Sequence, residues 1–308
     1  MNTRRSARPL MKFSIVTPWL NMDPWIGRAI ESVISQEGDF EIEYILSDGG
    51  STDRTVAIFE DYRARLTRGE WPVRCKAITM TSFSAKDEGT FDAINKGFAR
   101  ATGAIYTWAD ADNTYDPGAL QAVAKTFETF PDVMWVHAVT DVMNDHWEKT
   151  ARGTCRIYRQ DWLRLGIYSQ EAYATAQNGM FWRSELWKKA GPIPTTFRVS
   201  GDYWLWIRMA EHAPLWALNV AIGSFMRREG QLHTSASFKA ERWQARPHRS
   251  LSAWKARVFF SLQSRLGKRF EKVFVRLYPI FFTREPHPGY IDIVDGLPVK
   301  KTPQSYIC

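Results

Sequence analysis

Three β-rich apolar runs in the first half of the chain end in polar residues, and each is followed by a stretch of helical character. The runs end at Thr17-Pro18, at Asp48 and at Asp110, and one intervening helix is expected over 24–36. Strands that alternate with helices of about 10 to 15 residues indicate an α/β fold with a doubly wound, mostly parallel sheet. Ligands of such sheets bind beyond the carboxyl ends of the strands, where these polar residues fall.

Two carboxylates one residue apart, Asp110 and Asp112, follow the apolar run 104–109. Carboxylates at the end of a buried strand are costly unless they face a cation. Mg²⁺ and Mn²⁺ accept carboxylate oxygens and share the rest of their coordination shell with phosphates. A plain acidic turn explains the pair equally well, so its meaning depends on the surrounding segments.

Those segments resemble the inverting, non-processive family 2 glycosyltransferases of GT-A fold, in order and in spacing, from about residue 12 to residue 235. The resemblance rests on 14–18, 47–53, 92–97, 108–112, 177–183 and 201–206. It implies a GT-A-type domain over 11–240, with a Rossmann-like nucleotide-sugar-binding half over 11–115 and an acceptor half over 116–240. The Q-x-x-R-W motif of the processive synthases is missing.

The resemblance also assigns roles to single residues on the donor side. The residues expected around the nucleotide are Thr17, Pro18, Asn21, Asp48, which would read the base, and Asp87. Asp112 would bind a divalent metal, Mn²⁺ or Mg²⁺, and Asp110 would bind it directly or through water. Arg227 and Arg228 match the family's late basic segment and would contact the diphosphate, although a solvated basic loop fits them equally well.

Asp202 matches the position of the family's catalytic base. The acceptor hydroxyl loses its proton on the face opposite the departing diphosphate, so the base must stand apart from the metal. One base and direct displacement imply inversion at the anomeric carbon. A helix N-cap would be a sufficient structural role for Asp202. The family places an acid or a small residue before this base, and here Gly201 precedes it, so only one carboxylate is available. The family often has a further Asp where this chain has Asn113, which leaves the metal site one charge poorer.

The acceptor side is expected to include Gln177 and the aromatic ring of Trp182, since aromatic faces bind sugar rings. Most of the other tryptophans are interpreted as core residues. Trp204 and Trp206, for example, alternate with Leu205 and Ile207, so these side chains cannot all face one cleft. His137 and His146 have no partner at metal-ligand spacing and are interpreted as structural.

Residues 241–308 are expected to form a basic amphipathic helical region and a loop-like tail. Apolar residues recur every three or four positions over 251–278, and seven Lys or Arg stand there against one Glu. Such a helix either lies on an anionic membrane surface or packs on the catalytic domain. The formal net charge is +8, and most of it lies in this segment and in a disordered basic extension expected over 1–10. The rest of the chain is nearly neutral, which argues against nucleic acid as a partner.

These observations predict a glycosyltransferase that moves a sugar from a nucleotide-diphosphate donor, by family frequency a UDP-sugar, to a glycan or lipid-linked acceptor in cell-surface polysaccharide synthesis. The alternative is a non-catalytic protein that binds glycans or nucleotide sugars. A nucleotidylyltransferase and a dinucleotide-dependent oxidoreductase are disfavoured because their glycine-rich loops are missing. Three irregularly spaced cysteines and no apolar run of membrane-spanning length predict a cytoplasmic protein, peripheral on the inner face of the plasma membrane.

Overall fold

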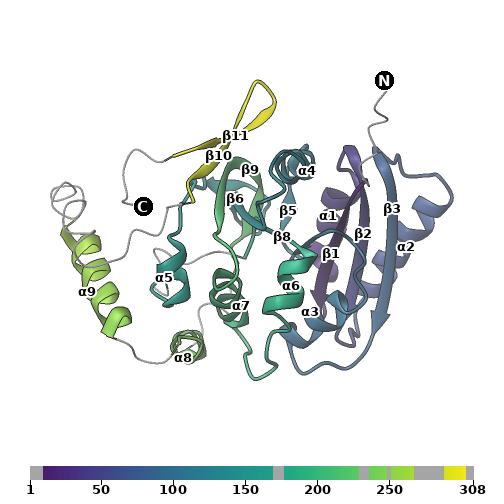
Figure 1. Cartoon of the computed structure of the whole chain (residues 1–308). Coiled ribbons are helices and arrows are strands. Elements are labelled where there is room, and N and C mark those ends of the chain that lie inside the picture. Colours follow the sequence, from purple (N-terminus) through teal and green to yellow (C-terminus); the bar gives the residue numbers. More distant parts are fainter. Residues whose placement is uncertain (1–9, 169–176, 229–235, 248–250, 267–287, 303–308) are drawn as a thin grey trace.

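The computed structural model describes residues 10–168, 177–228, 236–247, 251–266 and 288–302, and shows one large sheet with helices on both faces (Figure 1). The strand order is β11-β10-β9-β6-β8-β4-β1-β2-β3, and the short strands β5 and β7 pair with β9 and β6. The α/β fold expected from the alternating strands and helices is confirmed.

The N-terminal half is built on the parallel strands β4-β1-β2-β3. The strands are β1 (Met11–Trp19), β2 (Gly38–Asp48), β3 (Cys75–Ser84) and β4 (Ile105–Trp108). The connecting helices are α1 (Asp23–Ile34), α2 (Thr55–Thr67) and α3 (Thr90–Phe98). The sequence analysis did not name β3, because at this edge of the sheet only Met80 is buried and no apolar period marks the strand.

The second half adds an antiparallel strand, β8, between β4 and β6. Its strands are β5 (Thr114–Tyr115), β6 (Trp135–Met143), β7 (Lys149–Ala151), β8 (Met180–Arg183) and β9 (Trp216–Met226). Its helices are α4 (Ala119–Thr129), α5 (Gln160–Arg164), α6 (Ser184–Ala190) and α7 (Gly201–Ala210). β6 and β9 run parallel, so their carboxyl ends lie beside each other.

Two hydrophobic cores, one on each face, show that the sheet is doubly wound. One core takes side chains from α1, α2 and α4, and the other takes them from α3, α6 and α7. The buried faces of α1 and α3 follow the helical period, with Ile26, Ile30 and Val33 buried on α1. Burial on both sides anchors the strands, so the loops at their carboxyl ends are held in place.

The C-terminal region departs from its predicted organisation. Helix α8 (Ala236–Gln244) crosses the expected domain boundary at 240. The tail expected to be a loop contains a hairpin of β10 (Tyr290–Val294) and β11 (Leu297–Lys301), and β10 pairs with β9. Asp295 and Gly296 turn the hairpin with positive φ angles of 50° and 75°, as a type I′ turn requires. The neighbouring prolines obscured this hairpin in the sequence.

Helix α9 (Leu251–Leu266) forms where the basic amphipathic helix was predicted and packs on the domain. Phe259 and Phe260 are buried against Trp162, with ring centroids 6.2 and 5.5 Å apart. The remainder of the predicted helix, 267–278, and the basic extension over 1–9 lie outside the described residues. None of the helices in the described ranges combines the length and the apolarity needed to cross a bilayer.

Candidate active site

A cleft of about 1510 Å³ opens beyond the carboxyl ends of the central strands and is lined by both halves of the domain. It is where ligands of doubly wound sheets bind. Eight residues predicted for the site line it: Pro18, Asp87, Asp110, Asp112, Gln177, Asp202, Arg227 and Arg228. The fold therefore brings together side chains that are up to 210 positions apart in the sequence.

Asp112 is buried in the loop after β4 and is paired with a positively charged side chain. Its Oδ2 accepts a hydrogen bond of 2.9 Å from Nε of Arg228, which follows β9. The Arg228 guanidinium also lies 4.5 Å from the ring centroid of Trp25 on α1. Arg228 thus lies between the metal-binding candidate and α1, and its charge offsets the cost of burying the carboxylate.

Asp110 lies beside Asp112 in the same loop and lines the cleft. The pKa of Asp110 is raised to about 7, mainly by burial and further by the negative charges of Asp112 and Asp202. Asn113 opposes this effect by donating a 3.2 Å hydrogen bond to Asp110 Oδ2. Three carboxylates therefore concentrate negative charge in one cleft, and a cation bound by Asp110 and Asp112 would offset part of that charge.

The acidic pair fits a divalent cation that completes its shell with phosphate and water oxygens. Asp110 and Asp112 offer hard carboxylate oxygens in the cleft wall, the ligand type that Mg²⁺ and Mn²⁺ prefer. Over the described parts of the chain, no cluster of three or more His, Cys, Asp or Glu could hold a metal by itself, without oxygens from phosphate or water. The site suits a cation shared with a diphosphate.

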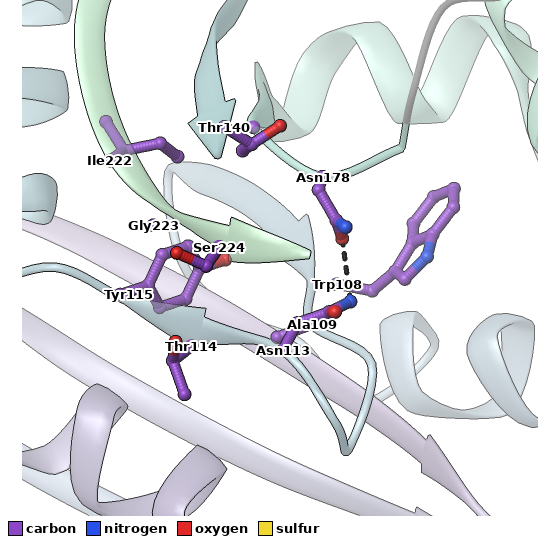
Figure 2. A pocket seen from close by; sticks show the side chains of 11 residues that line it. Trp108, Ala109, Asn113, Thr114, Tyr115, Thr140, Asn178, Ile222, Gly223 and Ser224 are labelled. Atoms are coloured by element: carbon purple, nitrogen blue, oxygen red, sulfur yellow. Dashed lines mark hydrogen bonds between the residues drawn. The ribbon is translucent and has the colours of Figure 1, made fainter. Parts of the chain in front are cut away.

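Asn113 has a structural role that the sequence analysis did not foresee. Its Nδ2 donates to Oδ1 of Asn178 at 2.9 Å (Figure 2). Its Oδ1 accepts from the backbone N–H of Met226 at 3.1 Å. These bonds join the β4–β5 loop to β9 and to the loop before β8. Asn113 therefore occupies a junction that needs both a donor and an acceptor, which a carboxylate could not supply.

Beside this junction lies a small cavity of about 20 Å³, shown in Figure 2, between Asn178, Thr140 and Ser224. Its volume suits about one water molecule. The buried Ser224 hydroxyl on its wall has no hydrogen-bond partner among the described residues. The cavity is part of the packing beneath the cleft and is too small for a sugar.

Asp202 stands in the first turn of α7 and lines the same cleft as the acidic loop, from which it is distant in the sequence. The N-cap of α7 is Ser200, so the N-cap interpretation of Asp202 is wrong. Asp202 Oδ1 accepts a 2.7 Å hydrogen bond from the backbone N–H of Tyr203. Burial raises the pKa of Asp202, whereas the positive charge of Arg242 lowers it. A desolvated carboxylate with a raised pKa is a stronger base.

Three residues predicted around the nucleotide have other contacts. The side chain of Thr17 is fully buried, with Oγ1 3.4 Å from the Tyr44 hydroxyl, so Pro18 and not the Thr17 side chain reaches the cleft. Asp48 is buried and accepts from the backbone N–H groups of Gly50 and Ser51. Asn21 Oδ1 accepts from the backbone N–H of Thr52 at 2.9 Å. Asp48 and Asn21 both shape the loop after β2.

The prediction that Trp182 contacts the acceptor is wrong, because its indole is fully buried. The ring centroid of Trp182 lies 5.4 Å from that of Trp108 and 5.7 Å from that of Trp206. Trp182 alternates with Phe181 on a central strand, where both faces of the sheet are covered. Gln177 does line the cleft, and its side chain donates to the backbone oxygen of Trp108.

Comparison with known proteins places this arrangement in a family. The model of glycosyl transferase family 2 matches residues 14–187, which is more than half of the chain. The chain belongs to glycosyl transferase family 2. It is 29% identical over 196 residues to an uncharacterized glycosyltransferase of Nostoc sp., and 27% identical over 195 residues to a PGL/p-HBAD biosynthesis glycosyltransferase of Mycobacterium tuberculosis. Each match covers 62% of this chain, and the chain spans 57% and 66% of these curated relatives.

Solved structures of GT-A fold are similar to this family 2 chain. S. aureus TarS 1–349 in complex with UDP matches with a TM-score of 0.54 and 16% identity, over 88% of this chain and 78% of that one. TarS 1–349 in complex with UDP-GlcNAc matches with a TM-score of 0.53 and 15% identity, over 96% and 97%. At this identity the likeness confirms the fold.

Several cleft residues of this family 2 protein were missed by the sequence analysis. His137, which was interpreted as structural, also lines the cleft; it packs against Tyr158, and burial lowers the pKa of its imidazole to about 4. Four arginines on the cleft wall were also missed: Arg152, Arg156, Arg198 and Arg242. They come from three separate segments of the chain, so no local pattern marked them.

Proposed function

We propose that this protein is an inverting glycosyltransferase that moves a sugar from a UDP-sugar to a glycan or lipid-linked acceptor in cell-surface polysaccharide synthesis. The observation that carries the proposal is that the acidic pair Asp110 and Asp112 shares one cleft with Asp202, which stands on a separate helix. Membership of family 2 and the UDP and UDP-GlcNAc complexes of TarS support the donor class.

In the proposed reaction, Asp202 accepts the proton of the acceptor hydroxyl as that oxygen forms a bond to the anomeric carbon. The bond from this carbon to the diphosphate oxygen breaks, and the nucleoside diphosphate leaves with the electron pair. Asp110 and Asp112 would hold a divalent cation, which supplies charge neutralisation for a departing diphosphate. Because the hydroxyl attacks opposite the leaving group, the anomeric configuration inverts.

Arg228 is proposed to act in donor binding by changing its partner. In this structure its guanidinium neutralises Asp112 at 2.9 Å, and Arg227 beside it is exposed on the cleft wall. If Asp112 held a divalent cation, the Arg228 guanidinium would be available to the phosphates of the donor, which arginine binds well. Arg228 would thus exchange one anionic partner for another without leaving a buried charge uncompensated.

We expect UDP to raise the melting temperature more than GDP, dTDP or ADP, and Mn²⁺ or Mg²⁺ to increase that shift. A ligand at about 100 times its Kd stabilises the native state by about 2.7 kcal/mol, so the correct base stands out in a thermal-shift screen. A larger shift with another nucleoside diphosphate would correct the donor. No shift with any of them would contradict the proposed function, and UDP-sugar binding without UDP release on prolonged incubation would favour the non-catalytic alternative.

We also propose that α9 brings the enzyme to an anionic membrane surface. Its inner face, with Phe259 and Phe260, is buried, whereas Trp254, Val258 and Leu262 are 60%, 39% and 46% exposed. These three side chains are four residues apart and form a stripe on the outer face. The basic residues over 251–278 complement anionic head groups. Packing on the domain and membrane contact therefore use different faces of one helix.

Replacing Trp254 and Leu262 together by serine is expected to weaken binding to phosphatidylglycerol-containing vesicles at least about tenfold, because burying one large apolar side chain contributes about 1.5–3 kcal/mol. Co-sedimentation at low and high salt measures this, with phosphatidylcholine vesicles for comparison. The control is Val73→Ser, which changes an apolar residue of similar exposure (46%) on the donor half. Equal binding by all three proteins, or none by the wild type, would refute the membrane proposal.

A further inference from the structure

Helix α8 holds the backbone segment that leads into α7, and it does so through one buried carboxylate. Glu241, 8% exposed, accepts hydrogen bonds from the backbone N–H groups of Arg198 (2.9 Å), Val199 (2.9 Å) and Ser200 (2.8 Å). Hydrogen bonds between a carboxylate and backbone N–H groups are short and strong. Three consecutive N–H groups directed at one carboxylate determine the path of the chain just before Asp202.

The start of α7 depends on α8 because it has no side-chain cap of its own. Ser200 occupies the N-cap position, yet its hydroxyl donates to the backbone oxygen of Phe238 on α8 at 3.2 Å. On the other side of the helix, a Cβ at Gly201 would lie 2.6 Å from Ile193 and 2.8 Å from Phe91. The backbone that carries Asp202 is therefore held between α8 and the core.

The next residue of α8, Arg242, acts electrostatically on Asp202, because burial raises the pKa of that carboxyl and the positive charge of Arg242 lowers it. Arg242 is 4% exposed, and its guanidinium lies 4.3 Å from the ring centroid of Phe238 and 5.0 Å from that of Tyr203, the residue after Asp202. It lines the same cleft as Asp202. Two neighbouring residues of one helix thus act on the same site: Glu241 holds the backbone, and the opposite charges of Glu241 and Arg242 both act on the Asp202 carboxylate.

We propose that Glu241 is a positioning residue for glycosyl transfer, which holds 198–200 so that the Asp202 carboxylate faces the acceptor hydroxyl. The inference rests on the proposed role of Asp202 as the base. It extends the proposed catalytic machinery, which already includes Asp202 beyond the family match over 14–187, into α8. Catalytic geometry is sensitive to such support, because a misplacement of about 1 Å lowers turnover about 100-fold.

Glu241→Gln is expected to lower turnover about 10- to 100-fold and leave the Kd of UDP unchanged within about twofold. The glutamine retains one acceptor oxygen but places an NH₂ group against backbone N–H groups, so the segment shifts. Turnover is measured as UDP release from the best-binding UDP-sugar with water as acceptor, and Kd by calorimetry. The control is Glu211→Gln, which removes an exposed carboxylate at the other end of α7, paired with Arg208.

A double variant separates positioning from general stability. If Glu241 acts through Asp202, adding Glu241→Gln to Asp202→Asn lowers turnover no further, because the group it positions is already lost. A multiplicative loss in the double variant, or parallel losses of turnover and UDP affinity in Glu241→Gln, would refute the inference. If Glu241→Gln does not fold, Glu241→Asp, which keeps the charge on a shorter side chain, allows the same comparison. Full activity of Asp202→Asn would instead contradict the proposed function itself.

Discussion

Asp202→Asn is expected to lower turnover about 100- to 10,000-fold while the affinity for UDP stays unchanged, because an amide cannot accept the acceptor's proton. Asparagine keeps an oxygen where Asp202 Oδ1 accepts the N–H of Tyr203 at 2.7 Å, so the first turn of α7 is preserved. The substitution also replaces a buried charged group by a neutral one, so the folded state is expected to keep its stability. The loss therefore lies in the chemical step and not in the fold.

Three measurements test this expectation: UDP release from the UDP-sugar, the Kd of UDP and the melting temperature. Glu185→Gln is the matched control, since Glu185 is an exposed acid in the first turn of α6, outside the cleft lining. Undiminished UDP release by Asp202→Asn at an unchanged melting temperature would remove Asp202 from the mechanism. A decline shared by Glu185→Gln would point to stability and not to catalysis.

Asp112→Asn is expected to abolish the contribution of Mn²⁺ to UDP binding, so that the Kd measured with Mn²⁺ rises at least about tenfold, equivalent to about 1.4 kcal/mol. A neutral amide is a poor ligand for a divalent cation that is shared with a diphosphate. The same change deprives Arg228 of its partner at 2.9 Å, so UDP binding without metal is expected to persist through the released guanidinium. Asp110→Asn is expected to weaken the Mn²⁺ effect less.

Calorimetric titration of UDP with Mn²⁺ and with a chelator distinguishes these effects. Asp116→Asn serves as control, because Asp116 is a nearby acid that pairs with Lys149 at 2.9 Å and lies outside the cleft lining. The metal role of Asp112 would be disproved by an identical Mn²⁺ dependence in the wild type and in Asp112→Asn. Arg228→Gln, measured in parallel, reports whether the guanidinium contributes to UDP affinity when the carboxylate is intact.

The sequence was sufficient for those parts of the site that follow from local order along the chain. Each parallel strand ends at the same edge of the sheet, so Pro18, Asp110 and Asp112 could be placed beside one another from strand periodicity alone. The segment around Asp202 was recognisable from its resemblance to a family, and the structure places it on the same cleft. These predictions needed no knowledge of side-chain packing.

Side-chain direction could not be predicted in the same way. Trp182 and Thr17 belong to recognisable segments, yet alternation along a strand that is covered on both faces buries them in the core. Asp48 stands at a strand end as expected, but backbone N–H groups two and three residues later take its carboxylate. Each outcome depends on which neighbours the fold supplies, and a sequence pattern does not contain that information.

The sequence by itself determined the sheet, its two layers of helices and the acidic groups at the strand ends, because hydrophobic periodicity and strand order are properties of consecutive residues. Only the tertiary structure decided that Arg228 pairs with Asp112, that Glu241 holds the backbone before Asp202, and that α9 exposes one apolar face while burying another. Those contacts join residues 41 to 116 positions apart. They arise from the packing of whole elements, which brings together charges and N–H groups that no local rule relates.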